Sequence, residues 1–207
     1  MSEVFTPIPE ALERFKNGEF LIVMDDEDRE NEGDLVIAAE HITPAKMAFL
    51  VRESSGYICA PLSNARADRL KLPLMLPPST QTDRHHTAYT ITVDYAIGTT
   101  TGISAGDRAK TCQMLANDEV KAEEFTRPGH VVPLRAVDGL LKERQGHTET
   151  AVQLCLSSGC KDAAVICELV REEDGMMQRL PDCVEFGKKH NIGIITIKSF
   201  KKYLEEQ

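Results

Sequence analysis

Residues 20–39 read Phe20-Leu21-Ile22-Val23-Met24-Asp25-Asp26-Glu27-Asp28-Arg29-Glu30-Asn31-Glu32-Gly33-Asp34-Leu35-Val36-Ile37-Ala38-Ala39. Two apolar runs, each of strand length, enclose a ten-residue segment in which seven residues are acidic. Short apolar runs bounded by polar turns are typical of strands that are buried in a sheet. The pattern therefore indicates a sheet whose strands hold the acidic segment in a fixed position.

The acidic segment, residues 25–34, carries a net charge of −6, whereas the whole chain carries −9. Like charges at this density repel one another, and folding alone does not require them. A divalent cation would convert the repulsion into ligation, because hard cations prefer carboxylate oxygens. In an extended backbone, Glu30, Glu32 and Asp34 would share one side, with Arg29 on the other. A solvated acidic loop remains the alternative on charge alone.

The composition indicates one globular domain over residues 1–207. No apolar run approaches the roughly 20 residues that span a bilayer, and the first residues lack the pattern of a secretory signal. The six cysteines are scattered without a Cys-x-x-Cys pair, so we expect reduced thiols. A pI near 5.2 argues against a nucleic-acid surface. We therefore expect a cytoplasmic protein with a small-molecule ligand and no membrane contact.

Helix and strand patterns alternate along the chain. Capping, proline and glycine positions predict helices over residues 7–17, 44–54, 64–70, 104–117, 148–157, 181–190 and from 199 onward. Apolar and alternating runs predict strands over residues 20–24, 35–39, 57–60, 88–94, 131–135, 163–170 and 192–197. This order predicts an α/β (α+β-like) fold, a three-layer sandwich in which helices flank a mixed β-sheet. Residues 72–87 have no clear period and are expected to form either a mobile loop over a site or a plain connector.

A predicted helix start near residues 144–148 has the features of a phosphate site. Unpaired N–H groups and the helix dipole favour an anion there. Arg144 can form a forked pair with phosphate, Gly146 permits close backbone approach, and Thr148 supplies a hydroxyl. His147 could ligate a metal through a ring nitrogen. The alternatives are an ordinary helix capped by Thr148 and a structural histidine.

Two further residues are candidates for proton transfer. His130 follows Arg127-Pro128-Gly129 at the start of a predicted strand. Glu168 lies inside the apolar run over residues 163–170. A buried carboxylate costs several kcal/mol unless it is paired or metal-bound, so we expect Glu168 to point into a polar site. Partnership with a core arginine is the alternative for Glu168.

Five segments together resemble the 3,4-dihydroxy-2-butanone 4-phosphate synthase family of riboflavin biosynthesis. They occur in the family's order over nearly the full chain, and the acidic segment is the most specific of them. The segments are residues 25–34, Gly102-Ile103-Ser104-Ala105-Gly106-Asp107-Arg108, Arg127-Pro128-Gly129-His130-Val131, Arg144-Gln145-Gly146-His147-Thr148-Glu149 and Ile166-Cys167-Glu168. Gln145 replaces a glycine that is common in the family. The chain ends at Gln207 without a GTP cyclohydrolase II half, so a stand-alone enzyme is expected.

The resemblance implies conversion of D-ribulose 5-phosphate to L-3,4-dihydroxy-2-butanone 4-phosphate and formate. It implies a lyase that requires Mg²⁺, or Mn²⁺, and a homodimer with active sites at or near the subunit interface. By position, Glu30 and His147 would hold the metal, and His130 and Glu168 would be the acid/base groups. The implied substrate-binding residues are Arg29, Glu30, Asp34, Cys59, Asp107, Thr111, Arg144, Gln145, Gly146, His147, Thr148 and Glu168.

Three other classes of protein share some of these features. An EF-hand starting at Asp28 would place Gly33 at position six, but position twelve is Ala39 and the flanks are strands. A relative of the threonylcarbamoyl-adenylate synthases would use a basic groove, which the acidic balance disfavours. Another sugar-phosphate isomerase or aldolase shares every feature derived from the residues, and only the family motifs argue against it.

Overall fold

The computed structural model describes residues 4–207, and in this range seven strands form one mixed sheet in the order β4-β5-β3-β6-β2-β1-β7. The pairs β1–β7 and β3–β5 are parallel, and the other neighbours are antiparallel. The predicted mixed sheet is confirmed. The strands are β1 (Leu21–Met24), β2 (Gly33–Ala38), β3 (Cys59–Leu62), β4 (Val93–Tyr95), β5 (Phe125–Arg135), β6 (Ala164–Glu168) and β7 (Gly193–Thr196).

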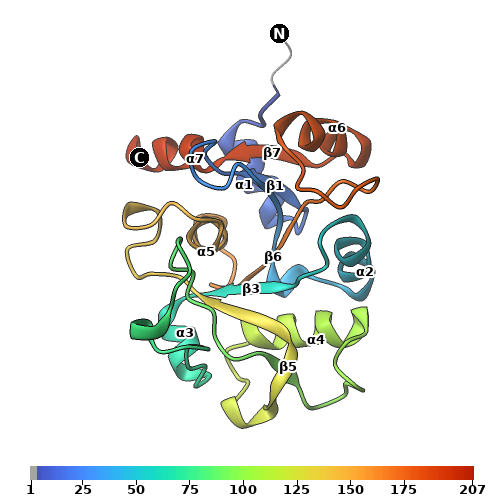
Figure 1. Ribbon diagram of the computed structural model, residues 1–207, viewed down its shortest axis with the longest axis vertical. Helices are drawn as coiled ribbons and strands as arrows, with labels where there is room; N and C mark the ends of the chain where they lie inside the picture. Colours follow the sequence, from blue (N-terminus) through green and yellow to red (C-terminus); the bar gives the residue numbers. More distant parts are fainter. Residues whose placement is uncertain (1–3) are drawn as a thin grey trace.

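Helices cover both faces of the sheet, which confirms the three layers. Side chains alternate along β1: Leu21 and Val23 pack with α1, α5 and α7, whereas Ile22 and Met24 pack with α2, α4 and α6. Figure 1 shows α5 and α7 on one side of the strands and α2, α4 and α6 on the other. The helices are α1 (Ile8–Lys16), α2 (Pro44–Glu53), α3 (Asn64–Arg69), α4 (Ala105–Ala116), α5 (His147–Ser157), α6 (Leu180–His190) and α7 (Ile197–Glu205).

The helix boundaries follow the predicted capping signals. The Thr43 side chain accepts a hydrogen bond from the Lys46 N–H, and Pro44 occupies the first turn of α2. Ser104 caps α4 in the same way. After α1, Gly18 adopts a φ of +81°, a conformation that glycine enters without steric cost. These local signals explain why the helix predictions agree with the structure to within one or two residues.

The predicted strand over residues 88–94 is wrong for most of its length. Only Val93–Tyr95 forms β4, and Tyr89 and Thr90 make isolated bridges to Leu134 and Leu74. The β4–β5 register shifts between Val93 and Asp94, so the ladder does not extend back to residue 88. Conversely, β5 begins at Phe125 rather than at residue 131. Smaller shifts occur in β3, which starts two residues later than predicted.

The sheet order brings the acidic segment to the end of β6. The β1–β2 hairpin is antiparallel, and its connection is the acidic segment. In the β2–β6 ladder, Asp34 is the partner of Glu168. Two residues that are 134 positions apart thus face one cavity, and the fold positions the candidate site at this end of the sheet. Within residues 4–207, no helix has the length and apolarity that a membrane crossing requires.

Candidate active site

His147 joins the start of α5 to the acidic segment. It is only 6% exposed. Its Nε2 lies 3.1 Å from the Val23 carbonyl oxygen, which can only accept, so Nε2 carries the proton in this hydrogen bond. Its Nδ1 lies 3.7 Å from a carboxylate oxygen of Glu30 and 3.9 Å from a carboxylate oxygen of Asp34. The nitrogen that remains for ligation therefore faces two carboxylates.

Asp25 organises the acidic segment. One of its oxygens accepts from the Glu32 N–H at 2.8 Å, and the other accepts from the Glu30 N–H at 3.1 Å. Arg29 also donates to Asp25 at 2.8 Å and forms an ion pair with Glu30. These contacts fix the backbone that carries Glu30. The sequence reasoning gave Asp25 no individual role; its position as the first acid after the apolar run was the available signal.

The buried charges shift one another's pKa values. Burial alone would lower the pKa of His147, but Asp34, Glu30 and Asp25 outweigh it and raise this pKa to about 9. Burial would raise the pKa of Glu30, yet His147 and Arg29 lower it to about 2. For Asp34, burial dominates and raises the pKa to about 7. At neutral pH, Glu30 is therefore ionised, whereas Asp34 exchanges its proton.

The residues present fit a divalent cation. One ligand atom each from Asp25, Glu30 and His147 lies within 4.8 Å of the others. The Asp34 Oδ1 atom is buried and has no hydrogen-bond partner, which is costly unless another group satisfies it. Carboxylate oxygens with one imidazole nitrogen suit Mg²⁺ or Mn²⁺. Because both Asp25 oxygens already accept N–H bonds, Glu30 and His147 are the better ligands.

The start of α5 lies beside this cluster, and Gly146 rather than Thr148 occupies the N-cap position. Thr148 is the second residue of the helix and lines the cavity. The Arg144 guanidinium donates to the Thr87 hydroxyl at 3.0 Å and to the His85 carbonyl at 3.1 Å, and it pairs with Glu149. Residues 85–87 therefore lie over the site, as one of the two alternatives for this loop predicted.

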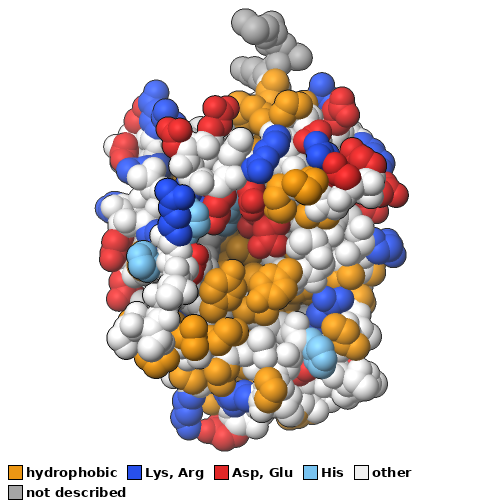
Figure 2. All heavy atoms as spheres, in the orientation of Figure 1, with side chains coloured by type: hydrophobic (Ala, Val, Ile, Leu, Met, Phe, Trp, Pro, Cys, Tyr) orange, Lys and Arg blue, Asp and Glu red, His pale blue; other side chains and the backbone are white. Residues whose placement is uncertain are grey.

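Eight of the predicted site residues line one small cavity of about 70 Å³. Figure 2 shows acidic side chains meeting histidine in a hollow of this face, with hydrophobic side chains directly below. The cavity also contacts Glu32, Thr87, Tyr89, Leu134 and Ile166. The eight predicted residues are Arg29, Glu30, Asp34, Cys59, Arg144, His147, Thr148 and Glu168.

Glu168 and Cys59 enter the cavity from neighbouring strands. A Glu168 oxygen accepts from the Ser55 hydroxyl at 2.8 Å. Within residues 4–207, no arginine forms an ion pair with Glu168. The alternative that Glu168 pairs with a core arginine is therefore wrong. Burial raises the pKa of the Cys59 thiol well above its usual value, which keeps this thiol neutral.

His130 lies outside the cavity lining, on β5. The ring Nδ1 of His130 is 2.7 Å from one Asp94 oxygen, and the backbone N–H of His130 donates to the other oxygen at 2.8 Å. The side chain is 43% exposed. Asp94 therefore orients a ring whose Nε2 is left for another group. The sequence reasoning missed Asp94, because only the bulged β4–β5 pairing places it beside His130.

Three further predicted residues also lie apart from the cavity. The Asp107 carboxylate accepts from Thr100 and Gly102. The Thr111 hydroxyl donates to the Asp107 carbonyl and accepts from the Tyr95 N–H, both at 3.0 Å. Gln145 is exposed beside a separate groove. Their predicted roles in substrate binding, like those of the cavity residues, stay predictions.

Comparison with known proteins agrees with the sequence resemblance. The profile of the family described as 3,4-dihydroxy-2-butanone 4-phosphate synthase matches residues 9–203. The proteins of that name from Candida albicans and Schizosaccharomyces pombe are 64% and 57% identical to this chain. The first match covers 100% of both chains, and the second covers 96% of this chain and 97% of the relative.

Solved structures agree in fold. The crystal structure of the Candida albicans synthase is 63% identical, with a TM-score of 0.89 over 98% of this chain and 99% of that chain. A synthase solved in complex with two magnesium ions is 45% identical, with a TM-score of 0.93 over 98% of each chain. With the family profile, the close relatives and the shared fold in agreement, the chain belongs to the 3,4-dihydroxy-2-butanone 4-phosphate synthase family of riboflavin-biosynthesis enzymes.

Proposed function

We propose that this chain, as one domain over residues 1–207, converts D-ribulose 5-phosphate to L-3,4-dihydroxy-2-butanone 4-phosphate and formate in the cytoplasm. One observation carries the proposal: His147, at the start of α5, faces the carboxylates of Glu30 and Asp34. A cation site and an anion-favouring helix start thereby share one cavity. A sugar phosphate whose hydroxyls and phosphate need these two environments fits this arrangement.

The phosphate would bind at the start of α5. Its N–H groups are free of partners within the helix, and the Thr148 hydroxyl lies beside them. Arg144 is held next to the same cavity by Thr87 and His85. The loop over residues 85–87 contributes Thr87 to the cavity lining, so it would lie beside the bound substrate.

Glu30 and His147 would hold Mg²⁺, or Mn²⁺, against the sugar hydroxyls. That a relative was solved in complex with two magnesium ions supports the choice of a divalent cation. When bound, the cation would stabilise negative charge on substrate oxygens and lower hydroxyl pKa values. Arg29 would keep Glu30 ionised, and Asp34, with a pKa of about 7, could accept a proton from a substrate hydroxyl and return it.

Glu168 and His130 would carry the other proton transfers. The proposed sequence comprises enediol formation, dehydration, a skeletal rearrangement and loss of formate, and each step moves a proton beside a carbonyl or hydroxyl. Ser55 fixes one Glu168 oxygen and leaves the other for the substrate. Asp94 fixes the His130 ring and would stabilise its charged form during transfer.

A homodimer would bring His130 to the cavity. In the β3–β5 and β3–β6 pairings, Cys59 is the partner of both Val132 and Ile166. His130 lies two residues before Val132 and Glu168 two residues after Ile166, so both lie at the level of Tyr57, on opposite sides of the β3 chain. His130 does not line the cavity of its own chain, so we infer that a second copy supplies it. Asp107 and Thr111, beside β4, would then help to shape that interface.

The test is to incubate the purified protein with D-ribulose 5-phosphate and either Mg²⁺ or EDTA, and to quantify formate. Formate that requires Mg²⁺, together with an equal amount of a four-carbon phosphate, is the expected result. Binding of the sugar phosphate without formate would point to another sugar-phosphate enzyme. If the folded protein produces no formate and does not bind the sugar phosphate, the proposal is overturned.

A further inference from the structure

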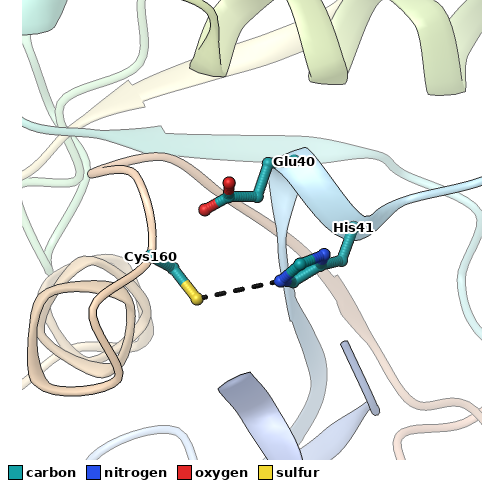
Figure 3. Close-up of side chains that lie close together, drawn as sticks. All are labelled: Glu40, His41 and Cys160. Atoms are coloured by element: carbon teal, nitrogen blue, oxygen red, sulfur yellow. Dashed lines mark hydrogen bonds between the residues drawn. The ribbon is translucent and has the colours of Figure 1, made fainter. Parts of the chain in front are cut away.

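A second cluster of metal-ligating side chains lies far from the active site. It comprises Glu40, His41 and Cys160, which Figure 3 shows turned toward one another. The His41 Nε2 atom is 4.0 Å from the Cys160 sulfur, and one ligand atom from each of the three residues lies within 4.8 Å of the others. These residues take no part in the proposed reaction.

The backbone brings the three side chains together. Glu40 and His41 belong to the short helix η1 (Ala39–His41), which directly follows β2. Cys160 lies after α5, in the turn that leads to β6. The β2–β6 ladder continues through a hydrogen bond from the Ala39 N–H to the Ala163 carbonyl at 2.9 Å. The Lys161 N–H also donates to Glu40 at 2.6 Å. The two segments are therefore held side by side before any ligand binds.

Two nearby ammonium groups have other partners. The Lys161 side chain pairs with Asp118. The Lys46 ammonium donates to the Gly18 carbonyl at 2.7 Å and to the His41 carbonyl at 3.2 Å, so it contacts the backbone rather than the imidazole. Neither Lys46 nor Lys161 therefore forms an ion pair within the cluster.

The donor set selects a particular class of cation. A thiolate, an imidazole and a carboxylate are the usual ligands of Zn²⁺, whereas a thiolate does not suit the hard cations Mg²⁺ and Ca²⁺. Zinc with three protein ligands keeps a fourth position for water. Glu40 is exposed, and His41 and Cys160 are half-buried, so solvent reaches the cluster and can fill that position.

We propose that Glu40, His41 and Cys160 form a Zn²⁺ site that joins the end of β2 to the turn after α5. Burial, followed by the charge of Glu40 and a hydrogen bond to it, raises the pKa of the Cys160 thiol. Zinc would bind the deprotonated Cys160 thiol, and the thiol proton would pass to the solvent.

The proposed zinc site is independent of the active site. His147 begins α5, and Cys160 lies three residues beyond the end of this 11-residue helix. At 1.5 Å per residue the helix alone separates the two sites by about 16 Å. No metal can bridge them. The zinc site is therefore separate from the active site, and Mg²⁺-dependent turnover does not depend on it.

The test uses Co²⁺ as a spectroscopic probe of EDTA-stripped, reduced protein, with Mg²⁺ in excess to occupy oxygen-ligand sites. Cobalt bound to Cys160 gives a near-ultraviolet thiolate-to-metal charge-transfer band, and one equivalent of Zn²⁺ abolishes it. Cys160→Ser and His41→Ala are each expected to weaken Zn²⁺ binding at least 100-fold, since even indirect ligand contacts contribute about 10–100-fold. Both variants are expected to retain formate production with Mg²⁺.

Cys59→Ala is the matched control, because Cys59 is the thiol that lines the active-site cavity. The charge-transfer band persists in this variant if the proposal is right. A band that disappears in Cys59→Ala but persists in Cys160→Ser would assign the thiolate to the active site and overturn the proposal. Absence of any band in the folded wild-type protein would overturn it as well. His41→Gln provides a second variant should Cys160→Ser fail to fold.

Discussion

Asp34 and Glu168 are direct partners in the antiparallel β2–β6 ladder, and both side chains enter the same cavity. Asp34 ends the acidic segment, and Glu168 ends the apolar run of β6. Because their neighbours Val36 and Ile166 pack on the α1–α5–α7 side, the two carboxylates point to that side as well. The start of α5 lies on the same face. The sheet register therefore aligns the proposed acid/base group Glu168 with the proposed anion-binding start of α5.

The first prediction concerns the metal ligands. Glu30→Ala and His147→Ala are each expected to lower formate production at least 1,000-fold while leaving the far-ultraviolet circular dichroism unchanged. The loss follows because general acid/base and metal contributions are each typically worth about 10²–10⁴-fold. Glu27→Ala, which removes an exposed acid of the same segment, serves as the control and is expected to retain turnover. Wild-type rates in either ligand variant would refute the metal assignment.

The second prediction separates the binding and catalytic roles of Glu168. Glu168→Gln preserves the hydrogen bond from Ser55 but removes the base, so substrate affinity is expected to persist while turnover falls by about 10²–10⁴-fold. Calorimetric titration with the sugar phosphate and formate assays measure the two effects. Ser55→Ala, which loosens the carboxylate without removing it, is expected to have a smaller effect. Unchanged turnover in Glu168→Gln would leave this residue with a structural role only.

Most of the fold could be predicted because its signals are local. The apolar runs on either side of the acidic segment specify β1 and β2, and the caps at Thr43 and Ser104 specify two helix starts. The irregular pairing of β4 could not be predicted, since the bulge beside Asp94 depends on contacts with β5. Local propensity in residues 88–94 favoured a full strand, and the tertiary context prevented it.

The same distinction applies to the candidate site. Glu30 and His147 stood out by residue type and segment, and the structure places them together. Asp25 and Asp94 did not stand out, because their importance lies in what they contact: the backbone of the acidic segment and the ring of His130. Contacts of this kind depend on register and rotamer, neither of which a single sequence specifies. Hydrogen-bonding supports are therefore the part of a site most easily missed.

The third prediction tests one of these supports. Asp94→Asn keeps the size of the side chain but removes the charge that faces His130 Nδ1, so the charged ring loses stabilisation. We expect kcat to fall about 10–100-fold with little change in KM, by analogy with partners that orient catalytic histidines. Asp68→Asn, which alters an exposed carboxylate paired with Arg135, is the control. A kcat equal to that of the wild type would remove Asp94 from the mechanism.

The fourth prediction concerns Arg144. Its Nη2 donates to Thr87 and His85 while its Nη1 pairs with Glu149, a forked geometry that a single ammonium does not reproduce. Arg144→Lys is therefore expected to raise KM for the sugar phosphate by about 10–100-fold, as the loss of a forked phosphate contact of about 1.5–3 kcal/mol implies. Arg179→Lys provides a comparison, because Arg179 contacts the acidic segment only through backbone carbonyls outside the cavity. Equal KM values for the wild type and Arg144→Lys would place the phosphate elsewhere.

The last prediction is a pH dependence of stability in the metal-free protein. The pKa of His147 is about 9 in the folded protein, against 6.5 for an unperturbed histidine, so the folded state binds more protons between these pH values. The stabilisation from charged His147 is fully present below pH 6.5 and is lost as the pH rises through 9. Urea unfolding in EDTA should therefore show a free energy of unfolding that falls over this range.

His147→Gln removes the titrating group, so its unfolding free energy should change less between pH 6.5 and 9 than that of the wild type. The stabilisation that Mg²⁺ provides should depend on pH in the opposite direction. A cation on Nδ1 displaces the His147 proton, and this displacement becomes easier as the pH rises, so the stabilisation that Mg²⁺ provides should increase toward pH 9. Parallel pH dependences in wild type and variant, with or without Mg²⁺, would show that His147 is not the proton-binding group of this cluster.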